Sequence, residues 1–476
     1  MMNTRRACGI LMSVSSLPGP YGIGSLGRPA FDFVDFLAQA GQTYWQILPL
    51  VPPGDGASPY MSTSAFAGNP YFIDLDLLVQ EGLLTRQDAD TARYEYPDRV
   101  DYAWLAQTRL PLLRRAWERS KTISRPDEPD LPWLEEFAAF SALHDRYQAP
   151  CWQWPAPPVA DEGDMDFYRF LQRTFYRQWF ALKDYANAKG IRIMGDIPIY
   201  LSADSVEMWT HPELFQLDEQ GRLSAVAGVP PDAFSEEGQL WGSPLYQWNN
   251  EKAAVFDFWR KRIVWCQRLY DAVRIDHFRA FHTYWSVPAQ AKTAMEGHWE
   301  TGPGMELLDA LHEAAPGLEL IAEDLGDLDA QALEFMRTCG VPGMKVMVFA
   351  FDPSGESAYL PHNCNGNCVA YTGTHDTPTF VQWLNEADPD SARFARSYLR
   401  LREDEGLGWG VIAGAWATGA RLAIAPMQDV LGLGADARMN TPGTMGTHNW
   451  TWRVRNEALN AHVAHRLKEL THIYRR

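Results

Sequence analysis

Eight short, mainly apolar runs, most of them bounded by Gly, Pro or Asp, recur along this chain of 476 residues. Continuous apolarity, without alternating polar residues, is typical of strands that are buried on both faces, as in a parallel sheet. The runs cover residues 9–14, 44–50, 191–197, 272–275, 318–322, 344–349, 369–373 and 422–425. We therefore expect eight buried strands.

Segments with apolar residues at helical spacing lie between these runs. Residues 31–40 show that spacing and stop at Gly41, and residues 256–269 and 305–314 show it as well. Strands that alternate with helices predict an α/β protein. Eight such strands predict one catalytic (β/α)8 TIM barrel over residues 1–476.

Two spacers are longer than a simple crossover between barrel strands requires. Residues 75–170 separate the second and third predicted strands, and residues 200–255 separate the third and fourth. We expect the first to be an inserted subdomain. We expect the second to be an inserted loop region that covers the active site at the barrel mouth.

The charge balance narrows the possible partners. The formal net charge is −18, so nucleic acid and anionic membranes are not expected to bind, whereas a neutral sugar is not excluded.

No stretch approaches the roughly 18 apolar residues of a membrane span. The apolar run after Arg5 and Arg6 lacks the cleavage site of a signal peptide. We expect a cytoplasmic protein whose six scattered cysteines are reduced thiols.

Acidic residues lie at the ends of four predicted strands. They are Asp196, Asp276, Glu323 and Asp376, which follow or end the third, fourth, fifth and seventh strands. The C-terminal ends of barrel strands share one face, where the active sites of barrel enzymes lie. An isolated acid is usually a solvated surface group. Four acids at the same topological position predict a functional site.

Two of these acids suit cleavage of a glycosidic bond with retention, which needs an ionised nucleophile and a protonated acid. Arg274 lies two residues before Asp276, so on a strand both side chains point the same way, and the guanidinium would keep Asp276 ionised. An ordinary ion pair inside the barrel is the alternative. Glu323 has apolar neighbours, which would raise its pKa and suit a general acid and base.

The remaining polar residues suit sugar binding. Asp376 would bind sugar hydroxyls and favour a distorted, oxocarbenium-like state. His277 and His375 would donate hydrogen bonds to sugar hydroxyls, although a lone His is often a structural group. The spacing of His and acidic residues is not that of a metal site, so no metal and no cofactor are expected.

A series of motifs extends over nearly the whole chain. The motifs are Ser15-Ser16-Leu17-Pro18-Gly19, Tyr21-Gly22-Ile23-Gly24, Ser58-Pro59-Tyr60, Gly68-Asn69-Pro70-Tyr71, Gly195-Asp196-Ile197-Pro198, Gly228-Val229-Pro230-Pro231-Asp232, Gln239-Leu240-Trp241-Gly242, Val273-Arg274-Ile275-Asp276-His277-Phe278-Arg279, Ala322-Glu323-Asp324-Leu325-Gly326, Thr374-His375-Asp376 and Met439-Asn440-Thr441-Pro442-Gly443-Thr444. In this order, they make the chain resemble amylomaltase, the bacterial 4-α-glucanotransferase family that includes the plant disproportionating enzymes.

The resemblance implies a barrel that transfers α-1,4-glucan segments to glucose or maltooligosaccharides by a retaining double displacement. It matches Asp276 to the nucleophile, Glu323 to the acid and base, and Asp376 to the residue that stabilises the transition state. It also implies sugar contacts, made by Tyr60, Asp196, Arg274, His277 and His375, and places Asn440 near the glucan groove.

Residues 228–242 resemble the mobile loop that covers the acceptor side in this family. A lid that excludes water and binds an acceptor favours transfer over hydrolysis, and Trp241 and Phe234 would supply stacking surfaces there. Many relatives have an aromatic residue directly after Pro-Pro-Asp, where this chain has Ala233. That difference would loosen acceptor binding or shift the balance toward hydrolysis.

Two other functions are alternatives to transfer. An α-1,4-glucan hydrolase of the same clan would need the same three carboxylates, and only the lid argues against it. A catalytically silent glucan-binding protein would need neither a nucleophile nor an acid, so the intact Asp276, Glu323 and Asp376 argue against that alternative.

Overall fold

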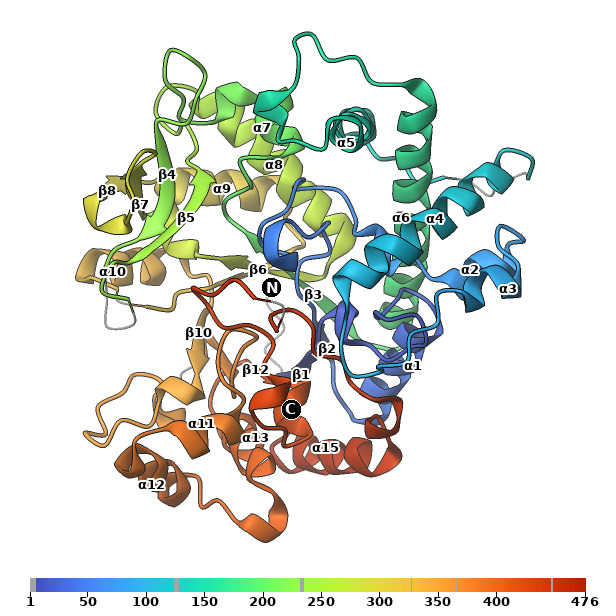
Figure 1. The fold of residues 1–476 in the computed structure, drawn as a ribbon. Helices are drawn as coiled ribbons and strands as arrows, with labels where there is room; N and C mark the ends of the chain where they lie inside the picture. Colours follow the sequence, from blue (N-terminus) through green and yellow to red (C-terminus); the bar gives the residue numbers. More distant parts are fainter. Residues whose placement is uncertain (1–5, 124–127, 232–234, 327, 365, 447) are drawn as a thin grey trace.

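The computed structural model describes residues 6–123, 128–231, 235–326, 328–364, 366–446 and 448–476. Its centre is a sheet of eight parallel strands in the order β10-β11-β12-β1-β2-β3-β6-β9 (Figure 1). The strands are β1 (Ala7–Leu11), β2 (Tyr44–Gln46), β3 (Arg192–Pro198), β6 (Ala272–Asp276), β9 (Glu319–Ala322), β10 (Gly343–Val346), β11 (Cys368–Tyr371) and β12 (Leu422–Pro426). All eight predicted strands are present.

The two edge strands of this sheet meet and close it into a barrel. The backbone nitrogen of Ala322, at the end of β9, donates a hydrogen bond of 2.9 Å to the carbonyl oxygen of Pro342, just before β10. The predicted (β/α)8 barrel is therefore confirmed. Its strands have the expected burial, since β11 and β12 are buried along their whole length.

Helices surround the barrel (Figure 1). They are α1 (Arg28–Gln39), α6 (Glu162–Ala188), α8 (Lys252–Leu269), α9 (Gly304–Ala314), α10 (Ala330–Cys339), α11 (Phe380–Glu386), α12 (Pro389–Tyr398), α13 (Leu407–Ala417), α14 (Met427–Val430) and α15 (Ala461–Ile473). The helix that was expected before Gly41 is α1, and Gly41 has the positive φ of 68° that ends it. Between β10 and β11 the described residues form only two 3-10 turns, Met347–Phe349 and Pro361–Asn363, so one crossover lacks an α-helix.

The long spacer after β2 is helical. It contains α2 (Leu75–Gln80), α3 (Arg86–Asp90), α4 (Tyr102–Ser120) and α5 (Leu134–Tyr147), and α6 follows them. Phe137, Phe140 and Leu143 of α5 form a small apolar cluster with Trp154 and with Val206 of α7 (Val206–Thr210), apart from the main core. No helix in the described parts of the chain is long and apolar enough to cross a membrane.

A second sheet, antiparallel and with four strands, lies beside β6 in Figure 1. Its order is β5-β4-β7-β8, with strands β4 (Ala225–Val229), β5 (Gln239–Pro244), β7 (Thr283–Pro288) and β8 (His298–Thr301). Two of these strands come from residues 200–255, for which the sequence predicts loop. The small residues of Ala225–Val229 give no alternating pattern, and β4 is held between its neighbour β5 and the distant strand β7.

Candidate active site

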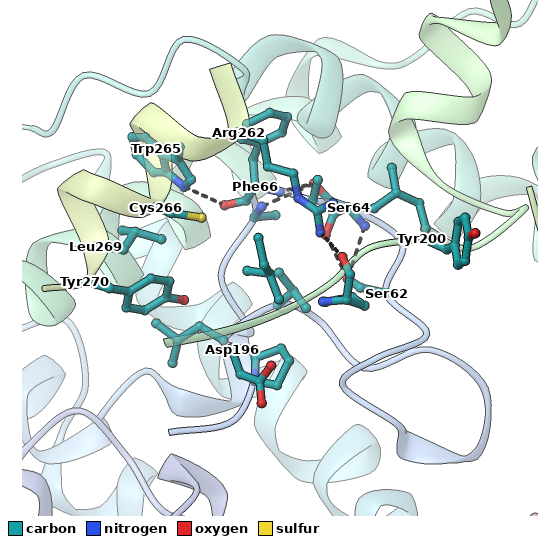
Figure 2. Close-up of a pocket in the computed structure, with 18 of the residues that line it drawn as sticks. Ser62, Ser64, Phe66, Asp196, Tyr200, Arg262, Trp265, Cys266, Leu269 and Tyr270 are labelled. Atoms are coloured by element: carbon teal, nitrogen blue, oxygen red, sulfur yellow. Dashed lines mark hydrogen bonds between the residues drawn. The ribbon is translucent and has the colours of Figure 1, made fainter. Parts of the chain in front are cut away.

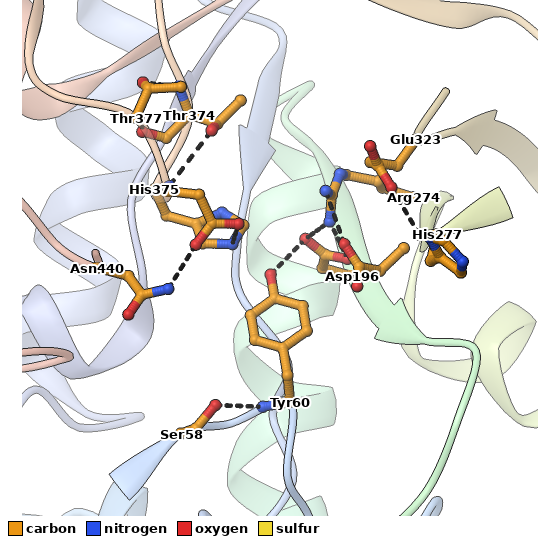
Figure 3. A network of polar contacts seen from close by, with 12 residues as sticks. Ser58, Tyr60, Asp196, Arg274, His277, Glu323, Thr374, His375, Thr377 and Asn440 are labelled. Atoms are coloured by element: carbon orange, nitrogen blue, oxygen red, sulfur yellow. Dashed lines mark hydrogen bonds and ion pairs between the residues drawn. The ribbon is translucent and has the colours of Figure 1, made fainter. Parts of the chain in front are cut away.

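Three of the predicted carboxylates are brought together by the register of neighbouring barrel strands. Asp196 on β3 lies opposite Arg274 on β6, and Ile275 lies opposite Ala322 on β9. The next residues along, Asp276 and Glu323, therefore leave adjacent parallel strands at the same level. Figure 3 shows Asp196, Arg274 and Glu323 close together in one network of polar contacts.

Arg274 connects two of the acids. Its guanidinium donates to both oxygens of Asp196, at 2.8 and 2.7 Å, and to Oδ1 of Asp276 at 2.9 Å. The last contact is the one that the two-residue spacing predicts. Arg274 is 3% exposed and Asp196 is fully buried. Burial alone would lower the pKa of Arg274, but the two carboxylates raise it well above its usual value. Asp276 therefore lies against a permanent positive charge.

Local packing fixes the strand that carries Asp196. A Cβ atom on Gly195 would lie 2.4 Å from the ring of Tyr270, so only glycine fits before Asp196. Figure 2 shows the pocket behind this segment, which Tyr270 and Arg262 line. Arg262 of α8 is buried and donates hydrogen bonds to the carbonyl oxygens of Pro198, at 2.6 Å, and Ile199, at 3.2 Å. These bonds satisfy backbone acceptors at the end of β3.

Tyr60 reaches the same network from the loop after β2. Its hydroxyl donates a hydrogen bond of 2.9 Å to Oδ2 of Asp196. Its ring stacks on that of His375, with 5.2 Å between the centroids and 13° between the planes. Tyr60 thus links the acids near β3 and β6 to the segment after β11.

Glu323 lies in a setting that favours its protonated form. Burial and the nearby charge of Asp276 raise its pKa, Arg274 and backbone hydrogen bonds lower it, and the result is a pKa of about 7. Its Oε2 accepts from the backbone nitrogen of His277 at 2.7 Å, and its Oε1 accepts from that of Leu325 at 3.0 Å. Both oxygens are therefore held in place.

Asp376 has the opposite electrostatic setting. Burial would raise its pKa, but His375 and Asn440 stabilise the ionised form and lower the pKa to about 2. Oδ2 lies 3.1 Å from Nε2 of His375, and Oδ1 accepts a hydrogen bond of 2.6 Å from Nδ2 of Asn440. Burial lowers the pKa of His375, yet the adjacent Asp376 raises it above its usual value.

His277 has an unused hydrogen-bonding atom at the site. Burial lowers its pKa to about 4, so the ring is neutral near pH 7. Among the described residues, its buried Nε2 has no partner. Buried polar atoms normally have one, so this nitrogen is available to a ligand. The backbone of His277 is left-handed, with φ of 55°, and turns the chain away from β6.

Trp241 of β5 brings the small sheet to the barrel mouth. Its ring meets that of His277 edge to face, with 4.8 Å between the centroids. Its Nε1 donates to Oε1 of Gln239 at 3.2 Å. Ala233 and Phe234, for which the sequence suggests roles in the same lid, lie outside the described residues.

The structure adds contacts that the sequence did not assign. Trp450 packs against the rings of Tyr60 and His375, with centroids 5.7 and 5.9 Å apart. The only sequence signal was that Trp450 follows the last motif. Among the described residues, no three His, Cys, Asp or Glu side chains are grouped so that they would hold a metal ion.

Comparison with known proteins agrees with this geometry. A family model described as 4-alpha-glucanotransferase matches residues 12–459. The 4-alpha-glucanotransferase of Clostridium butyricum is 43% identical over 486 residues, covering 98% of this chain and 100% of that protein. The enzyme of that name from Thermus thermophilus is 43% identical over 499 residues, covering 98% and 99%.

A solved structure shows the same similarity. The amylomaltase from Streptococcus agalactiae, solved in complex with acarbose, superposes with a TM-score of 0.93 at 40% sequence identity, covering 99% of this chain and 100% of that one. The region that the family model matches contains every predicted site residue, from Tyr60 to Asn440. The chain therefore belongs to the 4-alpha-glucanotransferase family.

Proposed function

We propose that this chain is a 4-α-glucanotransferase that moves α-1,4-glucan segments to glucose or maltooligosaccharide acceptors, with maltooligosaccharides and α-1,4-glucans as its substrates in the cytoplasm. The observation that carries the proposal is the contrast between two acids on adjacent strands. Asp276 is held against Arg274, whereas burial raises the pKa of Glu323 to about 7.

Asp276 acts as the nucleophile in this proposal. One of its carboxylate oxygens attacks the anomeric carbon of the donor, and the bond from that carbon to the glycosidic oxygen breaks. Glu323 gives its proton to the leaving oxygen. The products are a glycosyl-enzyme ester and a shortened glucan.

The second step reverses these roles. Glu323, now ionised, removes the proton from the acceptor hydroxyl, and the hydroxyl oxygen attacks the anomeric carbon. The ester bond to Asp276 breaks, and a new α-1,4 linkage forms with retained configuration. The strand geometry supports this mechanism, because adjacent strands lie about 4.8 Å apart and a retaining pair needs about 5–5.5 Å.

The other polar residues bind and polarise the sugar. Asp376, which stays ionised because its pKa is about 2, supports positive charge as the glycosidic bond breaks. The unused Nε2 of His277 supplies a hydrogen bond to a sugar hydroxyl. Tyr60, Asp196 and Arg274 form the buried floor on which the donor sugar rests.

The fate of the glycosyl-enzyme separates transfer from hydrolysis. Transfer conserves the number of glycosidic bonds, whereas hydrolysis creates one reducing end per event. Trp241 beside His277 gives the intermediate an apolar cover that excludes water and presents a surface to an acceptor ring. This feature favours transfer.

Incubation with maltotriose, without added metal or nucleotide, tests the proposal. We expect a ladder of oligosaccharides longer than maltotriose, release of glucose, and little net gain in reducing ends. Glucose and maltose alone, with rising reducing ends, would make the protein a hydrolase. No reaction, even with longer maltodextrins, would favour a silent glucan-binding protein.

A further inference from the structure

Asp429 is a buried carboxylate that the proposed mechanism does not use. It lies on α14, directly after β12, and is 1% exposed. It forms no ion pair with any residue that the structure describes. Burial raises its pKa to about 6, although hydrogen bonds from Thr372 and Phe380 lower it. Burying an acid without a cation is costly, so a gain in stability does not explain its presence.

The two oxygens of Asp429 join the two ends of one segment. Oδ2 accepts a hydrogen bond of 2.5 Å from Oγ1 of Thr372, the first residue after β11. Oδ1 accepts one of 2.7 Å from the backbone nitrogen of Phe380, the first residue of α11. Thr372 and Phe380 are both fully buried. One carboxylate therefore fixes both ends of residues 372–380.

This segment carries His375 and Asp376. Within it, Thr377 Oγ1 accepts from the backbone nitrogen of Thr374 at 2.9 Å. The hydroxyl of Thr374 in turn accepts from the backbone nitrogen of Asp376 at 3.3 Å. A Cβ atom on Gly373 would lie 2.8 Å from Thr377 Oγ1 and 3.6 Å from Asp429 Oδ2, so the carboxylate packs closely beneath the turn. Movement at Asp429 would therefore displace Asp376.

We propose that Asp429 is a positioning residue, which holds residues 372–380 so that Asp376 and His375 face the glucan in the geometry that the reaction needs. This inference rests on the proposed function. The chemistry explains why the residue is an acid. Two donors converge on it, and an ionised carboxylate accepts from both. An amide accepts from one and has to donate to the other group, which reverses the Thr372 hydroxyl and replaces a charge-assisted bond with a neutral one. Charge-assisted bonds are also shorter and more directional than neutral ones.

Asp429→Asn and Thr372→Val test the inference from the two sides of one hydrogen bond. In each variant we expect kcat on maltotriose to fall roughly ten- to hundred-fold, the cost of displacing a reacting group by about 1 Å. KM should stay within about two-fold, because an interaction that is made only in the transition state lowers kcat and kcat/KM together. Thr372→Ser keeps the hydroxyl and should restore kcat.

Asp74 offers a matched control. It is also buried, accepts a hydrogen bond of 2.6 Å from a hydroxyl, that of Ser25, and accepts one of 2.9 Å from a backbone nitrogen, that of Leu77. It caps α2, far along the chain from residues 372–380. Asp74→Asn makes the same change at a buried acid outside the site and should leave kcat per folded molecule unchanged.

The melting temperature separates positioning from simple stabilisation. Asp429→Asn removes a buried charge, so we expect it to melt no lower than the wild type at pH 7 while losing kcat. Wild-type kcat in both Asp429→Asn and Thr372→Val would overturn the inference, as would a joint loss of kcat and melting temperature in Asp429→Asn. An inactive wild type would instead overturn the proposed function.

Discussion

Oε2 of Glu323 accepts a hydrogen bond of 2.7 Å from the backbone nitrogen of His277, the residue that follows Asp276. The acid that follows β9 is therefore tied to the end of β6, which carries Asp276, the proposed nucleophile. A shift of either strand end would move the carboxylates of Asp276 and Glu323 together. This arrangement fixes their separation.

The raised pKa of Glu323 gives a pH dependence with a definite sign. Glu323 must be protonated to donate to the leaving oxygen, and its pKa is about 7, so the acid form is lost as the pH rises through 7. We expect kcat/KM for maltotriose to fall on the alkaline side with an apparent pKa near 7. Initial rates from pH 5 to 9 measure it.

Glu323→Gln tests whether Glu323 causes this loss of activity at alkaline pH. We expect activity on maltotriose to fall by about 10²- to 10⁴-fold, the usual contribution of a general acid and base. The leaving group of maltosyl fluoride needs no protonation, so this variant should cleave maltosyl fluoride faster than it cleaves maltotriose. Added azide should attack the glycosyl-enzyme and yield maltosyl azide of α configuration. If the alkaline limb persists in this variant, another group is responsible for it.

Asp276→Asn removes the nucleophile and keeps the shape of the side chain. We expect turnover of maltotriose to become undetectable, because an amide does not form the glycosyl ester. The amide oxygen still accepts a hydrogen bond from Arg274, so binding of maltoheptaose, measured by titration calorimetry, should change little. Turnover at the wild-type rate would refute the assignment of the nucleophile.

Asn440 donates a hydrogen bond of 2.6 Å to Asp376 and, after His375, helps to lower the pKa of that carboxyl group. Asn440→Ala removes one hydrogen bond to a carboxylate, worth about 1.5–3 kcal/mol, so kcat should fall roughly ten- to hundred-fold. Asn440→Asp places a second carboxylate there, and like charges raise the pKa of the pair. We therefore expect its pH optimum to move to lower pH, where a shared proton restores the hydrogen bond. An unchanged optimum would contradict this account.

The barrel and the central acids could be predicted because their signals are local. Each strand lies in a mainly apolar run, and Asp276 and Glu323 lie one residue beyond such runs. The contacts of Asp429 could not be predicted, because they join Thr372 and Asp429, which are 57 residues apart in sequence and meet only where β11 and β12 end side by side. The strand Ala225–Val229 was missed for a similar reason, since its pairing with β7 supplies the order that its small residues lack.

Trp241 offers a test of what separates transfer from hydrolysis. Its ring covers His277 at the barrel mouth, and its removal would open the glycosyl-enzyme to water. We expect Trp241→Ala to raise the share of reducing ends formed per maltotriose consumed, while the formation of longer products falls. Trp241→Phe keeps an aromatic face and should remain closer to the wild type. Because the catalytic carboxylates are untouched, total donor cleavage should change less than the partition between water and sugar. If the ratio of hydrolysis to transfer is the same in the wild type and in both variants, other residues provide the apolar cover over the intermediate.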